Sequence, residues 1–295
     1  MSKIHWRRWR PRGSMRYSTV QKSSTDETDP FVIVHQRLKN QPLGRSFWKR
    51  THDFRILNQL IDESKAIAGR TNSAADWLYA LTLQAPRAAV AQEAMDAHPH
   101  GYRNKEARLF ELIDFNDAFV ATILALSKPM LPRATLEIKR LLEEACKKAG
   151  TRCFSDEQYQ AIVHGLSREI AVYLGLQQEG YDAVMSNRAD DAMGVDMRVT
   201  DPSAHHTVNV DIKTRSSYHY RIEQLRREGR LSEDAFLMAD RDGFAVVYNG
   251  HGADKIKVVV WRIDHEVLGT VIDFSFKDTY RLAEQMNVIM VAANN

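Results

Sequence analysis

The sequence predicts an α/β domain in its C-terminal half, with a mixed β-sheet flanked by helices, preceded by an all-helical module and a basic N-terminal arm. Apolar residues recur at helical spacing from about residue 52 to residue 150. After residue 153, short segments in which apolar and polar residues alternate stand between helical segments. The excess of positive charge lies entirely in the first fifty residues. We therefore divide the chain into an arm at 1–50, a module at 51–152 and an α/β domain at 153–295.

The arm is strongly basic, and we expect it to be largely disordered. Residues 1–50 contain twelve Lys or Arg and three Asp or Glu, whereas residues 151–295 contain sixteen basic and twenty-two acidic residues. Arg7, Arg8 and Arg10 lie between and beside Trp6 and Trp9, a composition suited to phosphate contacts with stacking on bases. A solvated tail and an organelle transit peptide share this composition, so all three interpretations stay open.

Four helices are predicted in the module, after an apolar segment at 31–34 that is predicted to form a short strand or a docking segment. Asn72 and Ser73 are favourable N-cap residues, and Pro132 and Gly150 bracket the last helix. Pro86 is predicted to kink or split the second helix, because proline lacks an amide hydrogen. The predicted helices span His52–Ala68, Ala74–Met95, Asn104–Lys128 and Arg133–Lys148.

The α/β domain is predicted to begin with a helix followed by three strands. Ser155 and Gln158 form a capping box that opens a helix through about Gln177. Residues 208–214 alternate between apolar and polar, as a strand with one buried face does. Asp242-Gly243 is a hairpin signal between two later strands. The predicted elements after the first helix are strands Tyr181–Ser186, Val195–Val199 and Val208–Thr214, helix Tyr220–Gly229, strands Ala235–Ala239, Phe244–Tyr248 and Ile256–Ile263, and helix Lys277–Met286.

Four polar residues near the start of this domain indicate a catalytic site. Glu169 lies at the edge of the apolar stripe of the leading helix, and Asp196 lies in a predicted strand. Asp211 and Lys213 share the polar face of the next strand, because they are two residues apart. Carboxylates beside a lysine can hold a divalent metal ion next to a second positive charge, and phosphodiester hydrolysis needs little more.

Glu169 on a leading helix, Gly194-Val195-Asp196 on one strand and Asp211-Ile212-Lys213 on the next resemble the PD-(D/E)XK, or restriction-endonuclease-like, nuclease superfamily over about residues 153–263. The resemblance implies a restriction-endonuclease-like sheet and metal-dependent cleavage of nucleic acid, with DNA favoured over RNA. It also implies that Asp196, Asp211 and the Ile212 carbonyl bind Mg²⁺ or Mn²⁺, ions that prefer such oxygen ligands. Lys213 would orient and help deprotonate the attacking water, and Glu169 would bind a second metal or its water.

Two features depart from the better-marked branches of the superfamily. Val195 occupies the position of the proline that precedes the first Asp, and Gln224 is followed four residues later by Glu228 rather than by tyrosine. Exposed helix charges are typical of a solvated face as well as of phosphate contacts. The predicted nucleic-acid contacts are Arg215, Arg221, Arg226, Arg227, Arg7, Arg8 and Arg10.

Other interpretations of these residues remain open. Asp211 and Lys213 could form an ordinary ion pair on an exposed strand face. Asp190 and Asp191 are expected to be loop residues, either of which could substitute as an acid.

The rival functions are an inactive nuclease-fold protein that binds nucleic acid or acts as a scaffold, and an interaction protein whose helical module binds another protein. Two histidine pairs lack further zinc ligands at suitable spacing: His98 with His100, and His205 with His206.

Composition restricts the setting of the protein. No apolar stretch is long enough to cross a bilayer, and the two cysteines, Cys146 and Cys153, cannot form a disulfide framework. We therefore expect an intracellular protein, cytoplasmic or nucleoid-associated, unless the arm directs it to an organelle. The expected partner is nucleic acid, and a homodimer or a protein partner for the helical module are further options.

Overall fold

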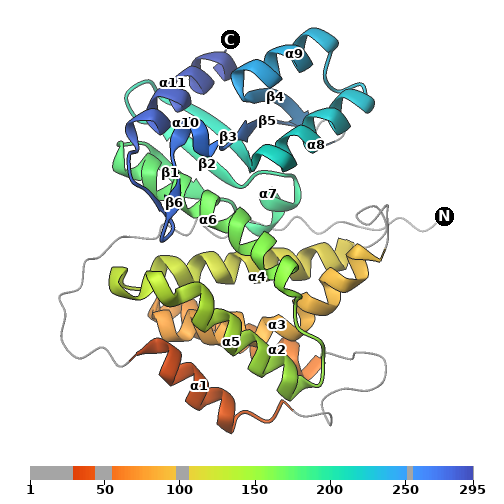
Figure 1. The fold of residues 1–295 in the computed structure, drawn as a ribbon, viewed down its shortest axis with the longest axis vertical. Helices are drawn as coiled ribbons and strands as arrows, with labels where there is room; N and C mark the ends of the chain where they lie inside the picture. The colour runs from red at the N-terminus through yellow and green to blue at the C-terminus, as the bar shows by residue number, and fades with distance from the viewer. Residues whose placement is uncertain (1–28, 44–54, 98–105, 251–254, 295) are drawn as a thin grey trace.

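The computed structural model describes residues 29–43, 55–97, 106–250 and 255–294. A group of helices occupies one end of the molecule, and a β-sheet with its covering helices occupies the other (Figure 1). The predictions for Arg7, Arg8, Arg10, His98 and His100 lie outside the described residues.

The four helices predicted for the module are confirmed, with small shifts at their ends. α3 continues through Pro86 to Asp96, so the predicted split is wrong. Gly150 adopts a left-handed conformation with φ of 73° and ends α5 as predicted. Among the described helices, none is both long and apolar enough to span a membrane. The elements are α2 (Arg55–Thr71), α3 (Ala74–Asp96), α4 (Glu106–Ala125), the short 3₁₀ helix η2 (Lys128–Met130) and α5 (Leu131–Ala149).

A further helix, α1 (Pro30–Asn40), replaces the strand or docking segment predicted at 31–34. The Asp29 side chain caps it by accepting from the Phe31 amide over 3.0 Å, and Pro30 stands at the first helical position, where its missing amide hydrogen is not needed. Phe31, Val34 and Leu38 are buried at helical spacing, and α1 packs against α3 and α5. This segment therefore belongs to the helical part rather than to the arm.

The C-terminal half contains the predicted mixed sheet. Its five strands have the order β1-β2-β3-β5-β4, in which β3 and β5 are parallel and the other neighbours antiparallel. The predicted capping box of Ser155 and Gln158 opens α6. The strands and main helices are α6 (Asp156–Gln178), β1 (Asp182–Met185), α7 (Arg188–Ala192), β2 (Met197–Asp201), β3 (His206–Lys213), α8 (Arg215–Arg227), α9 (Glu233–Asp242), β4 (Phe244–Asn249), β5 (Ile256–Arg262) and α11 (Tyr280–Asn294). Between β5 and α11 lie α10 (His265–Leu268), β6 (Val271–Ile272) and β7 (Ser275–Phe276).

The strand predicted at Ala235–Ala239 is wrong, because these residues lie in α9. Ser232 caps this helix by accepting from the Ala235 amide over 3.2 Å, and acidic residues occupy its first turn, where the helix dipole favours them. Gly243 follows with φ of 75° and ends the helix. The Asp242-Gly243 pair is thus a helix end rather than a hairpin turn.

The helix α6 belongs to two hydrophobic cores. Its first half, including Tyr159 and Leu166, packs into the core of the helical part. Its second half, including Val172 and Leu176, packs on one face of the sheet together with α11. The opposite face of the sheet is covered by α8 and α9. Glu169 lies where α6 passes from one core to the other, so the junction of the two halves is also the position of the predicted site.

Candidate metal centre

The ladder between two neighbouring strands places Asp196 beside Asp211. β2 pairs antiparallel with β3, with Met197 opposite Val210. One residue before Met197, the Asp196 amide donates to the Val210 carbonyl over 2.8 Å. The Ile212 amide donates to Asp196 Oδ2 over 2.5 Å. These two bonds hold the Asp196 carboxylate next to the last residues of β3.

Lys213 lies between these carboxylates. Its ammonium group donates to Asp211 Oδ1, donates to the Ile212 carbonyl over 3.3 Å and lies 3.8 Å from Asp196 Oδ2. Asp211 is only 2% exposed, so the alternative of an ion pair on an exposed strand face is wrong. One positive group thus contacts or approaches all three oxygen atoms that are expected to bind the metal.

The charge on Asp211 and Lys213 depends on this burial. Burial raises the pKa of Asp211 to about 7; the Lys213 ammonium opposes that rise, and the Asp196 carboxylate adds to it. Burial would lower the pKa of Lys213, but the Asp196 and Asp211 carboxylates outweigh it and raise that pKa above its usual value. Lys213 is therefore an ammonium ion here, suited to offset negative charge on a phosphate.

Glu169 belongs to the same electrostatic cluster. Burial raises the pKa of Glu169 well above its usual value, and the charges of Asp196 and Asp191 raise it further, while Lys213 opposes them. Glu169 lies on α6, which packs against β1 and β3. The structure therefore brings all four predicted residues into one cluster.

A fourth carboxylate, Asp191, was expected to be a loop residue. Burial raises its pKa to about 8, and the Asp196 and Asp117 charges add to the rise. Asp191 lies in α7, which Asn187 caps by accepting from the Ala189 amide over 2.8 Å. Its neighbour Asp190 differs, since it accepts from Asn187 Nδ2 over 2.7 Å and so supports the turn. Two adjacent acids before Gly194 were the only sequence signal, and that signal does not distinguish them.

The helical part contributes a further acid that sequence reasoning did not identify. Asp117 lies in α4, which packs against both α6 and α7. Burial raises its pKa to about 7, an effect that Lys65 opposes and Asp114 increases. Its charge in turn raises the pKa of Glu169 and Asp191. No sequence pattern links residue 117 to residues 169–213, because the contact exists only where the two halves meet.

A hard divalent cation suits this set of oxygen atoms. Within the described part of the chain, no group of three or more His, Cys, Asp and Glu side chains is already arranged to hold a metal ion. The predicted ligands nevertheless converge on one positive charge, the Lys213 ammonium. Burial is the main cause of the raised pKa values of Glu169 and Asp191, and the neighbouring carboxylates add to the rise while Lys213 opposes it. Carboxylate and carbonyl oxygens are the ligands that Mg²⁺ and Mn²⁺ prefer.

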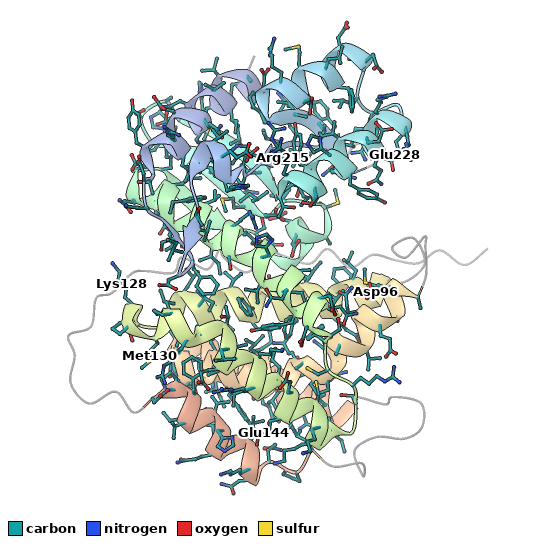
Figure 2. All side chains as sticks on the ribbon, in the orientation of Figure 1. Asp96, Lys128, Met130, Glu144, Arg215 and Glu228 are labelled. Atoms are coloured by element: carbon teal, nitrogen blue, oxygen red, sulfur yellow. The ribbon has the colours of Figure 1, made fainter. Side chains whose placement is uncertain are left out.

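The four described arginines that were predicted to bind nucleic acid divide into two kinds. Three form ion pairs on the surface: Arg215 with Glu266 at 3.3 Å, Arg226 with Glu233 at 3.4 Å and Arg227 with Glu223 at 3.0 Å. Figure 2 shows Arg215 and Glu228 marking the two ends of α8, which carries all four. Arg221 alone turns inwards and is half-buried, with its charge acting on Asp211.

Comparisons of the chain with protein-family models, with curated proteins and with solved structures found no match.

Proposed function

We propose that this protein is a metal-dependent nuclease that hydrolyses phosphodiester bonds in nucleic acid, with DNA favoured over RNA by the resemblance to the restriction-endonuclease-like superfamily. The observation that carries the proposal is the convergence of Asp196 Oδ2, Asp211 Oδ1 and the Ile212 carbonyl on one half-buried ammonium group. The order of a leading helix, three antiparallel strands and a later strand parallel to the third supports it.

Each residue has a role in this proposal. Asp196, Asp211 and the Ile212 carbonyl would hold a Mg²⁺ or Mn²⁺ ion, which supplies positive charge and Lewis acidity at the scissile phosphate. Lys213 orients the attacking water and offsets charge on the phosphate. Glu169, with a pKa raised by burial and by Asp196, can accept a proton or bind a second ion.

The first experiment compares cleavage of labelled single- and double-stranded DNA and RNA in Mg²⁺, Mn²⁺ or EDTA. We expect metal-dependent cutting by the natural chain and a loss of about 100-fold or more in Asp211→Ala, because one ligand and one partner of Lys213 are removed. Asp234→Asn is the matched control, since Asp234 is an exposed acid in the first turn of α9.

Two outcomes would contradict the proposal. Equal cutting by Asp211→Ala and the natural chain would show that the activity does not arise at this site. No cutting of any substrate by a folded natural chain would favour an inactive nuclease-fold protein that binds nucleic acid or acts as a scaffold.

A further inference from the structure

Two arginine side chains converge on one buried amide beside the metal centre. Arg221 donates to Asn249 Oδ1 over 3.3 Å, and Arg230 donates to the same oxygen over 2.6 Å. Asn249 is 5% exposed, and its Nδ2 donates to the Met193 carbonyl over 2.8 Å. That last bond fixes the orientation of the amide, so its oxygen faces the two guanidinium groups.

This arrangement lies next to the proposed metal ligands. Met193 and Gly194 form the turn that leads to Asp196, and Asn249 ends β4. A side chain at Gly194 would approach Asn249 Nδ2 to 3.1 Å, so the turn and the amide are in close contact. From α8, Arg221 is close enough to Asp211 that its charge opposes the effect of burial on that carboxyl group.

Arg221 differs from its neighbours in what balances its charge. Arg230 forms an ion pair with Glu228 at 3.1 Å, and the other arginines of α8 have carboxylate partners. Among the described residues, Arg221 has no carboxylate within ion-pair distance; it bonds only to the neutral oxygens of Gln224, at 3.2 Å, and Asn249. A guanidinium group has five donors, so several remain for an anion.

We propose that Arg221 forms a phosphate-binding subsite beside Asp211, held in place by Asn249, whose side-chain oxygen Arg230 also contacts, and that it contacts a backbone phosphate of the nucleic-acid strand. Guanidinium groups bind phosphate oxygens with two parallel hydrogen bonds, which a lysine cannot reproduce. A half-buried position increases the strength of such a contact. This inference rests on the proposed function, because it assigns the substrate contact of the same site.

The test measures binding of a fluorescently labelled oligonucleotide by anisotropy in EDTA at low ionic strength, so that neither metal nor turnover is needed. We expect Arg221→Gln to weaken binding by about 10- to 100-fold, as loss of a charged hydrogen bond does. Arg221→Lys should lie between Arg221→Gln and the natural chain, because it keeps the charge and loses the paired bonds. Arg241→Gln removes an exposed arginine of α9 that pairs with Asp242 and has no assigned role in binding, and it should change binding by about twofold at most.

A second measurement separates charge from folding. The slope of log affinity against log salt should fall by about one in Arg221→Gln, since one phosphate contact is lost. Its circular dichroism and unfolding temperature should stay close to those of Arg241→Gln. Competition with inorganic phosphate and with a mononucleotide tests the source of the phosphate: we expect both to compete far more weakly than an unlabelled oligonucleotide.

The outcomes distinguish this subsite from the proposed function. Selective loss of binding in Arg221→Gln, with no cleavage by the natural chain, would retain the subsite and overturn the nuclease proposal. Equal binding by Arg221→Gln and Arg241→Gln, or no binding of oligonucleotide by the natural chain, would overturn the subsite whether or not the protein cleaves. Competition by inorganic phosphate as strong as by oligonucleotide would overturn the assignment to a strand.

Discussion

The protonation of single carboxyl groups links the candidate site to the stability of the folded chain. Burial raises the pKa of Asp191 to about 8 and that of Asp211 to about 7, whereas aspartate in an unfolded chain has a pKa of about 4. Between these values the folded protein holds protons that the unfolded chain has released. The contribution of these two groups to stability therefore falls as pH rises through this window. Below about pH 4 both groups are protonated in the folded and the unfolded chain, and that contribution is complete.

The change Asp191→Asn should make the metal-free protein less sensitive to pH. In EDTA, the unfolding temperature of the natural chain should fall between about pH 5 and pH 8, and this fall should be smaller in Asp191→Asn, because the variant has one fewer buried group to deprotonate. Thermal unfolding measured across this range provides the check. Asp234→Asn, at an exposed position, should keep the natural pH dependence. An unchanged slope in Asp191→Asn would contradict the assignment of Asp191 to the buried cluster.

At the scale of elements, short end signals decide where helices begin and stop, and contacts decide how they pack. α6 shows both, because its capping box was visible in the sequence while its packing was not. Gly175 faces α11 so closely that a Cβ atom there would lie 2.7 Å from Leu282 Cδ2. Gly165, ten residues earlier in the same helix, is exposed and has nothing within 4 Å of such an atom.

Alanine at these two glycines should therefore have opposite consequences. Gly165→Ala should stabilise the protein by up to about 1 kcal/mol, because alanine is the better helix former. Gly175→Ala gains the same propensity but overpacks the contact with buried Leu282, and it should be less stable than Gly165→Ala by about 1–3 kcal/mol. Denaturant unfolding of the two variants measures the difference. Equal stabilisation would mean that α6 and α11 do not pack as closely as described.

At the scale of the whole molecule, one buried carboxylate connects the helical part to the element that carries Asp191. Asp114 of α4 accepts from Arg87 of α3 at 3.1 Å, and it lies 3.4 Å from Lys65 of α2 and 3.5 Å from Arg188 of α7. Arg188 also lies over the Phe110 ring, 4.4 Å from its centre. The helical part thus holds α7 against the site, and its own Asp117 adds charge there.

Removing this carboxylate should weaken the entire protein. Asp114→Ala leaves the buried Arg87 without its charged partner, and loss of one member of a buried pair costs about 3–5 kcal/mol. The measurement is the free energy of unfolding, compared with Asp62→Ala at an exposed position of α2. An effect no larger than that of Asp62→Ala would show that Asp114 does not join the two halves.

The sequence by itself determined the element types that local signals specify and the core of the candidate site. Strand alternation puts Asp211 and Lys213 on one face whatever surrounds them, and the capping box of Ser155 and Gln158 identifies the start of α6 without knowledge of its neighbours. A local sequence signal cannot decide between two kinds of structure that both use it. Asp242-Gly243 suits a hairpin turn and a helix end equally, and only the helix of residues 233–242 decides between them.

Tertiary structure alone decided which charges face the site. Arg221 and Arg227 lie on the same helix and look alike in the sequence, yet one turns towards Asn249 and the other pairs with Glu223 on the surface. Asp117 reaches the cluster from a helix that ends thirty residues before α6. Burial and electrostatic coupling depend on packing between segments that are distant in the chain, so no local pattern of residues contains them.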